Sequence, residues 1–193
     1  DIFTPSNRRH RYAFTNCTNC GPRFTIATDA PYDRAATTMA SFTMCAPCRH
    51  EYEDVGDRRF HAQPVACADC GPTLSVVRCV ADDADHASLS ASPARSDAEV
   101  MSDAADALRR GLIVAVKGIG GFHLACDATS EAAVVRLRER KHREEKPLAV
   151  MVRSIADAEV CAHLTEVHRS LLLSAERPIV LADRRDESTL AAS

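Results

Sequence analysis

Apolar and polar residues in the second half of the chain recur with the periods of helices and strands. Apolar positions at helical spacing over Glu99–Arg110 predict an amphipathic helix that Gly111 ends, and the apolar run Leu112–Val116 is typical of a short buried strand. The same reasoning predicts a helix over Ser130–Lys141, with Ser130 as N-cap, a strand over Leu148–Val152, a helix over Ser154–His163 and a strand over Ile179–Leu181. This alternation predicts an α/β domain with a mixed sheet.

The first half of the chain has a different pattern, which is a tandem duplication. A shift of 50 positions aligns CTNCGP, Cys17–Pro22, with CADCGP, Cys67–Pro72. It also aligns residues 7–9 with 57–59 and 24–26 with 74–76. A third Cys-x-x-Cys pair, Cys45 and Cys48, would have its counterpart before the first residue. We therefore expect the chain to begin within a longer first repeat.

Cysteine spacing predicts one complete metal site. Eighteen residues separate Cys48 from Cys67, within the range of about 15–20 that is typical of four-cysteine zinc sites, whereas twenty-four separate Cys20 from Cys45. Cys45, Cys48, Cys67 and Cys70 are thus the predicted ligands of a structural zinc ion, and Cys17 and Cys20 are predicted to be half of a second site. The competing interpretation is a redox dithiol.

Composition sets the domain boundaries and the class of protein. A stretch rich in Ser, Ala and Asp, Asp82–Ala98, shows no apolar period and is typical of an exposed linker. The predicted division is a half finger over 1–26, a complete finger over 27–80, a linker over 81–98 and an α/β domain over 99–193. A net charge of -3 argues against a globally basic nucleic-acid binder. Nine cysteines without a signal peptide or membrane span favour a cytoplasmic metalloprotein.

Two segments of the second half could bind anions. The loop KGIGGFHLACDA, Lys117–Ala128, has glycines that allow close backbone approach to a ligand, but it matches neither the dinucleotide fingerprint nor the P-loop. Basic residues crowd the helix end and turn in RKHREEK, Arg140–Lys146. Together the segments could hold a triphosphate and a small anion. A plain glycine turn and a solvated helix end are the simpler interpretations.

Several stretches together resemble one family. RRFHAQPVACADCGP, PYDRAATTM, MCAPCRHEYED, KGIGGFHLACDA and RKHREEKPLAVM are similar to the HypF family of hydrogenase-maturation carbamoyltransferases. The resemblance covers nearly the whole chain outside the linker. It implies the end of a first zinc finger, a complete second finger and the first part of a YrdC-like domain, and it also implies that the chain alone is inactive.

The resemblance implies a multistep reaction. Carbamate released from carbamoyl phosphate would be adenylated with ATP and Mg²⁺, and the carbamoyl group would pass to the C-terminal cysteine of a partner, HypE, as a cyanide precursor. The ATP- and carbamate-binding residues implied are Lys117, Gly120, Gly121, His123, Lys141, Arg143 and Lys146. No catalytic residue is assigned.

Two other functions stay open. A threonylcarbamoyl-adenylate synthase of tRNA modification shares the YrdC-like fold but does not need the duplicated fingers. A zinc-ribbon nucleic-acid adaptor is the non-enzymatic option. Against it, residues 1–72 hold eight Arg and eight Asp plus Glu, so the finger region has no excess positive charge.

Overall fold

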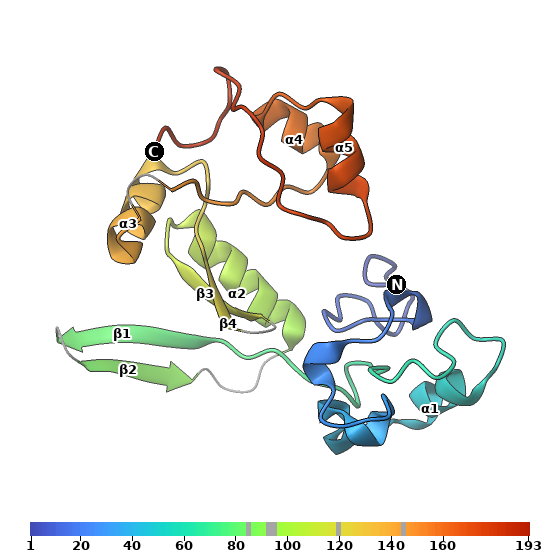
Figure 1. The fold of residues 1–193 in the computed structure, drawn as a ribbon. Helices are drawn as coiled ribbons and strands as arrows, with labels where there is room; N and C mark the ends of the chain where they lie inside the picture. The colour runs from blue at the N-terminus through green and yellow to red at the C-terminus, as the bar shows by residue number, and fades with distance from the viewer. Residues whose placement is uncertain (84–85, 92–95, 119–120, 144–145) are drawn as a thin grey trace. The chain divides into compact units, whose positions relative to one another are not determined.

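The computed structural model describes residues 1–83, 86–91, 96–118, 121–143 and 146–193. The chain divides into two compact units, Asp1–Ala105 and Asp106–Ser193 (Figure 1). Among the described residues, no helix has both the length and the apolar character needed to cross a bilayer.

Unit 1 begins with short turns and little regular structure. Its 3-10 turns are η1 (Thr18–Cys20), η2 (Phe24–Ile26), η3 (Arg34–Ala36) and η4 (Thr38–Ser41), followed by the helix α1 (Ala46–Glu53). The apolar cluster is small and consists of Tyr12, Met39 and Ala66, with Ile26 and Phe42 packed against it. A core of this size supplies little stabilisation, so polar contacts and metal binding have to contribute.

Arginine side chains hold the loops of unit 1 together. The guanidinium of Arg34 donates to three backbone carbonyls at 2.7–2.9 Å, those of Phe42, Gln63 and Val65. The side chains of Arg9 and Arg59 are only 2% and 6% exposed. Loop carbonyls that have no partner in a helix or sheet are satisfied by these side chains, which is the requirement for burying irregular backbone.

A β-hairpin occupies much of the predicted linker. Strands β1 (Val77–Asp83) and β2 (His86–Ala91) pair antiparallel, with Val77 opposite Ala91. The prediction of a linker or long loop without regular structure over Asp82–Ala98 was therefore wrong for the residues that β1 and β2 include. Ala87, Leu89 and Ala91 alternate with serine at the period of a strand. This alternation was missed because alanine and serine are weak strand formers.

Helix α2 (Asp97–Arg109) confirms the first predicted helix and shows how its ends are set. Ser96 and Glu99 form reciprocal hydrogen bonds, from the Ser96 N–H to Glu99 Oε2 at 2.9 Å and from the Glu99 N–H to Ser96 Oγ at 3.3 Å. This is a capping box. Gly111, with φ of +73°, lies just past the helix in the left-handed region that glycine tolerates.

The described part of unit 2 contains the end of α2, a second hairpin and three further helices. Strands β3 (Val114–Gly118) and β4 (Gly121–Ala125) pair antiparallel, and they are followed by α3 (Glu131–Lys141), α4 (Ile155–Cys161) and α5 (Glu166–Leu173). Helix α3 buries Ala133, Val134 and Leu137. The predicted helices over 130–141 and 154–163 are confirmed, whereas α5 was not predicted.

Two predicted strands do not form among the described residues. The segments 148–152 and 179–181 have no strand assignment, and only an isolated bridge, Ala162 with Arg184, lies nearby. Met151 is 97% exposed and Ile179 is 80% exposed. A strand is defined by pairing with a neighbour, so a strand-like apolar pattern without a paired edge remains extended chain.

Candidate functional site

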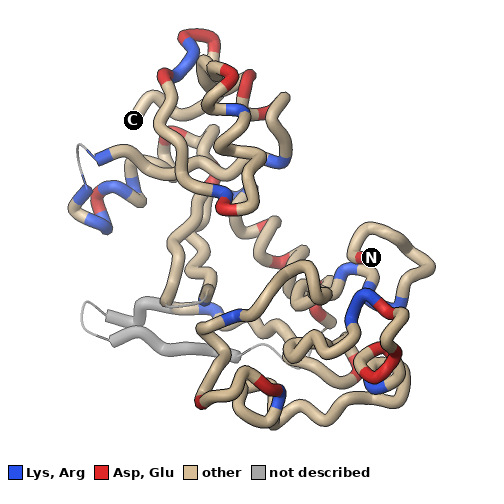
Figure 2. Tube along the Cα trace, turned by 45° about the vertical axis from the view of Figure 1, so that its right-hand side comes forward, with Lys and Arg blue, Asp and Glu red and all other residues tan. Residues whose placement is uncertain are grey.

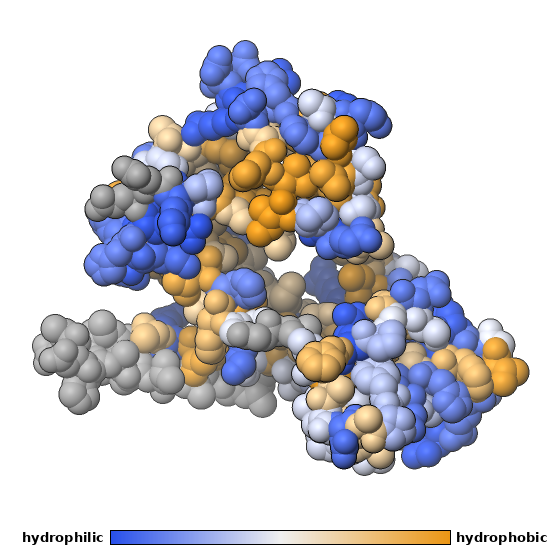
Figure 3. Space-filling view, viewed as in Figure 1, coloured by the Kyte–Doolittle hydropathy of each residue, from blue (hydrophilic) through white to orange (hydrophobic). Residues whose placement is uncertain are grey.

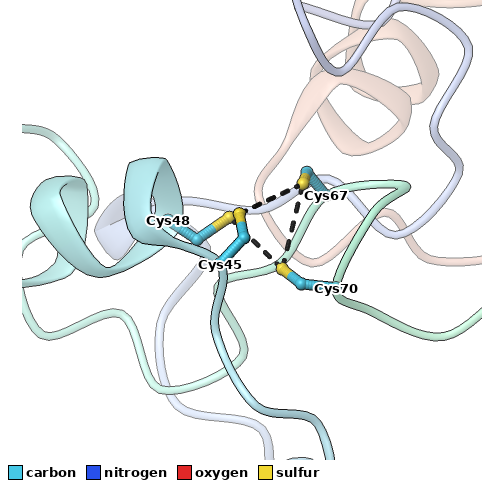
Figure 4. Close-up of side chains that lie close together, drawn as sticks. All are labelled: Cys45, Cys48, Cys67 and Cys70. Atoms are coloured by element: carbon cyan, nitrogen blue, oxygen red, sulfur yellow. Dashed lines mark hydrogen bonds between the residues drawn. The ribbon is translucent and has the colours of Figure 1, made fainter.

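Four cysteines of unit 1 converge on one point (Figure 4). Cys45 is the N-cap of α1 and Cys48 lies in its first turn, while Cys67 and Cys70 belong to a tight turn in which the N–H groups of Cys70 and Gly71 donate to the Cys67 carbonyl. The sulfur atoms all lie within 4.8 Å of one another. Helix start and turn therefore present the two cysteine pairs to each other.

The sulfur–sulfur distances fit a tetrahedral metal ion. Cys45 and Cys67 are 3.8 Å apart, Cys67 and Cys70 3.8 Å, and Cys48 and Cys70 3.6 Å. Four sulfurs around a zinc ion at about 2.3 Å would be separated by about 3.8 Å. The predicted ligand set is thus brought together with the geometry of a closed, structural site.

Burial makes the four thiolates dependent on a cation. Burial raises the pKa of the Cys48 thiol to about 12. It also disfavours the Cys70 thiolate, but backbone hydrogen bonds from Cys45 and Cys67 prevail and lower the pKa of Cys70 to about 7. Four charges this close cannot coexist unless a metal ion compensates them.

Gly71 directly follows the second cysteine of the Cys67 and Cys70 pair, and packing requires a glycine at this position. A Cβ atom at this position would lie 2.2 Å from the hydroxyl oxygen of Tyr12 and 2.5 Å from the Cβ of Ala66. Its repeat counterpart Gly21 instead has a φ of +69° and open space around it. The same glycine serves packing in one repeat and backbone conformation in the other.

Cys17 and Cys20 form only a pair in the described residues. Their sulfurs are 3.9 Å apart and exposed, and the one group of three or more potential ligands found within the described ranges is the Cys45 cluster. A second metal site at Cys17 and Cys20 stays a prediction.

The glycine loop of unit 2 lies at the turn of the β3–β4 hairpin. The Lys117 ammonium on β3 sits 5.3 Å from the centroid of the Phe122 ring. A Cβ at Gly118 would lie 2.9 Å from the His123 ring, so this glycine lets the imidazole cover the backbone. Gly121 has a φ of +152°, and Gly120 lies outside the described residues. Lys117 and His123 lie on the two paired strands, next to the last described pair of the hairpin, Gly118 with Gly121.

The basic turn follows α3 and is held by Arg138. Its guanidinium Nη1 donates to the carbonyls of Arg143 at 3.0 Å and Lys146 at 2.9 Å, and Arg143 Nη2 donates to the Pro147 carbonyl at 3.1 Å. Lys141 ends the helix, with His142 in the left-handed region at φ 47°. Figure 2 shows Lys and Arg gathered at this end of α3. Because the C-terminal end of a helix is the negative end of its dipole, a basic cluster there favours bound anions only through its side chains.

The described residues of the two basic segments are not joined by a hydrogen bond or an ion pair. In the described part of unit 2, no hydrogen bond or ion pair links Lys117 or His123 to Lys141, Arg143 or Lys146. A shallow hollow of about 440 Å³ is lined by Ala156, Glu159, Val160, Arg185 and Glu187, and none of the predicted binding residues lines it. The ATP- and carbamate-binding set stays a prediction.

Comparison with known families matches both halves of the chain. The family described as "HypF finger" matches residues 1–27 and 44–77, and the Sua5_yciO_yrdC family, described as "Telomere recombination", matches residues 106–193. The gap at 28–43 falls between the cysteine-containing segments of the finger region.

Curated proteins and solved structures of one kind match nearly the whole chain. Carbamoyltransferase HypF of Rhodobacter capsulatus is 51% identical over 92% of this chain and 22% of its own length, and carbamoyltransferase HypF2 of Cupriavidus necator is 48% identical over 96% and 22%. The crystal structure of T. kodakarensis HypF has a TM-score of 0.83 at 42% identity, over 98% of this chain and 23% of that one. A full-length HypF in the phosphate- and nucleotide-bound form gives 0.80 at 46% identity, over 99% and 23%.

Fold and site define a cysteine-finger protein with an α/β domain of the YrdC type, as predicted from the sequence. The chain belongs to the HypF family of carbamoyltransferases. It spans about a fifth of the length of the relatives that it matches.

Proposed function

We propose that the chain is part of a carbamoyltransferase of nickel–iron hydrogenase maturation, which converts carbamoyl phosphate and ATP to carbamoyl-adenylate and passes the carbamoyl group to the C-terminal cysteine of HypE. The observation that carries the proposal is the similarity of the whole chain, fingers and α/β domain together, to proteins named carbamoyltransferase HypF. One of the similar structures is described as phosphate- and nucleotide-bound. The protein is proposed to act in the cytoplasm.

The basic residues of unit 2 would act by charge stabilisation. In the adenylation step a carbamate oxygen attacks the α-phosphorus of ATP and pyrophosphate leaves. Lys117, Lys141 and Arg143 would offset the negative charge that develops on the phosphates, with Lys146 beside them and Mg²⁺ accompanying the nucleotide. Gly120 and Gly121 would allow close backbone approach, and His123 would orient a phosphate.

Zinc is proposed to be the resident metal of the Cys45 cluster. A closed set of four thiolates without an open coordination position is typical of structural zinc, and the sulfur spacing described above supports it. The metal would hold α1 and the Cys67–Gly71 turn together and would take no part in the transfer.

The test compares two activities of one full-length protein that contains this sequence. Lys141→Ala and Arg143→Ala should each lower carbamate-dependent ATP–pyrophosphate exchange by on the order of a hundredfold, while carbamoyl phosphate hydrolysis stays intact. Arg153→Ala is the matched control, since Arg153 is 91% exposed and its one ion pair within the described residues is with Asp157. Equal losses in both activities would indicate misfolding, and unchanged exchange would contradict the assignment.

A threonylcarbamoyl-adenylate synthase is the second candidate, favoured by the match of residues 106–193 to the Sua5_yciO_yrdC family. It would use threonine and bicarbonate in place of carbamate. Exchange that depends on threonine and not on carbamoyl phosphate would support this candidate over the first.

Nucleic-acid binding has less support. Arg9, Arg34 and Arg59 of the finger region are engaged with carbonyls and carboxylates of the chain itself. Binding of RNA that weakens steeply with salt would reopen this function.

A further inference from the structure

Two arginines from the start of the chain reach the complete cysteine cluster. Arg8 Nη2 lies 3.2 Å and Arg9 Nη2 3.4 Å from the sulfur of Cys48. Both donors come from a segment about forty residues earlier than the cysteine, with separations of 40 and 39 positions. The sulfur of Cys48 therefore accepts from a neighbouring repeat in addition to binding within its own.

Glu51 and a backbone carbonyl fix the two guanidinium groups in place. Arg9 donates to Glu51 Oε1 at 3.0 Å and through Nε to the Ala66 carbonyl at 2.8 Å, and Arg8 donates to Glu51 Oε2 at 2.8 Å. Burial alone would raise the pKa of Glu51, but the hydrogen bonds from Arg9 and Arg8 outweigh it and lower the pKa to about 2. Glu51 is thus a carboxylate at any ordinary pH.

The two arginines offset part of the charge of a four-thiolate metal centre. One divalent ion with four thiolates carries a net charge of about -2, which is costly to bury. Two guanidinium groups beside Cys48 offset it, and Glu51 orients them at the expense of one negative charge. N–H groups and cations next to a metal-bound sulfur also reduce the electron density that the sulfur offers to competing reagents.

The duplication repeats the contacts of the two arginines with a carbonyl and a carboxylate. Under the 50-residue shift Arg9, Ala66 and Glu51 correspond to Arg59, Asn16 and Asp1. The Arg59 Nε donates to the Asn16 carbonyl at 3.1 Å, and Arg58 and Arg59 both pair with the Asp1 carboxylate. The second arginine of each pair, Arg9 or Arg59, thus binds the carbonyl that precedes a cysteine of the other repeat. Because this contact recurs in both copies, it is a regular structural feature of the two fingers.

We propose that Arg8 and Arg9 are positioning residues of the metal centre, which the first repeat supplies to the second. They would raise the retention of the metal and lower the reactivity of the Cys48 sulfur. This inference rests on the zinc site proposed above, and its test separates the two.

The experiment uses the zinc-loaded chain and its cobalt(II)-substituted form. Arg9→Met should speed zinc transfer to a chromophoric chelator by on the order of tenfold, because outer-shell partners typically alter metal affinity by about 10- to 100-fold. It should also move the sulfur-to-cobalt charge-transfer band to lower energy, since an unbonded thiolate is easier to oxidise. Arg9→Lys, which keeps the charge, should give smaller changes in both.

Two further variants make the result decisive. Arg49→Met is the matched control, since Arg49 lies on α1, is 55% exposed and pairs with Glu53 at 3.7 Å, and it makes no hydrogen bond to sulfur in the described part of the chain. Arg8 is 30% exposed, so Arg8→Met carries the test if Arg9→Met fails to fold. Faster zinc loss with an unchanged charge-transfer band, or no change in either measurement, would overturn the proposal. A wild-type chain that retains no zinc would instead overturn the zinc assignment.

Discussion

The space around Gly71 is filled from two sides. A Cβ at Gly71 would lie 2.2 Å from the Tyr12 hydroxyl oxygen. Tyr12 cannot move aside easily, because it is 1% exposed and its hydroxyl donates to the Pro72 carbonyl at 3.1 Å. Gly71→Ala should lower the stability of the finger by about 1–3 kcal/mol, the usual cost of overpacking. Thermal unfolding of the zinc-loaded chain measures it.

Gly56 provides the control for this substitution. An added Cβ there would meet only the Asp54 carboxylate oxygen, at 3.3 Å. Gly56→Ala should therefore leave the unfolding temperature nearly unchanged. If both variants behave alike, Tyr12 can move and the packing argument for Gly71 is wrong.

Arg138 is predicted to act on the reaction through the backbone of the basic turn. It holds the carbonyls of Arg143 and Lys146, two of the residues proposed to bind ATP or carbamate. In a full-length protein, Arg138→Ala should lower ATP–pyrophosphate exchange by on the order of tenfold, because a small misplacement of charged groups is costly.

The neighbouring Arg140→Ala is the comparison for Arg138→Ala, since Arg140 is exposed on the same helix. It should retain most of the exchange activity. A larger loss with Arg140→Ala than with Arg138→Ala would show that direct charge matters more than the shape of the turn.

Residues were predictable from the sequence where the signal is local. The Cys45 cluster follows from spacing and duplication, which are visible in the chain itself. The contact of Arg9 with Cys48 was missed because it joins positions 39 apart. A pair of arginines at the same place in both repeats, 8–9 and 58–59, was the available signal.

Elements were predictable where their ends carry a standard cap. Ser154 begins α4 and its side chain accepts from the Asp157 N–H, as its sequence position indicates. Helix α5 begins with Thr165 and His168 in a capping box, where histidine stands in place of the usual Glu or Gln. The missed β1–β2 hairpin uses alanine and serine, which are weak strand formers, whereas the residues of α5 favour a helix and only its capping histidine departs from the usual start signal.

The two serines that start α3 and α4 are predicted to differ in their contribution. Ser154→Ala removes a cap hydrogen bond of 3.2 Å and should lower the stability of unit 2 by about 1 kcal/mol. Ser130 is also an N-cap, but its side chain makes no cap hydrogen bond, so Ser130→Ala should cost much less. Urea unfolding followed by circular dichroism compares the two variants. Equal losses would mean that the cap hydrogen bond contributes little.

At the scale of the whole molecule, the two units are stabilised by different means. Unit 1 has few buried apolar side chains and depends on arginine contacts and on its cysteine cluster. Unit 2 has no comparable cluster in its described residues, and it exposes large apolar side chains such as Met151, Ile179 and Leu181. Figure 3 shows apolar residues gathered over α4 and α5. Exposed apolar surface of this kind favours association.

Removal of the metal should therefore affect one unit and spare the other. With zinc bound, limited proteolysis of the chain should leave a protected piece around Cys45–Cys70, because metal binding supplies folding free energy that the small core lacks. With a strong chelator the piece should disappear, whereas cleavage beyond Leu181 should proceed at the same rate in both conditions. Cys67→Ser in the presence of zinc should reproduce the chelator pattern. Protection of Cys45–Cys70 that survives both treatments would show that unit 1 folds on arginine and apolar contacts alone, and that the cysteine cluster is not what holds it together.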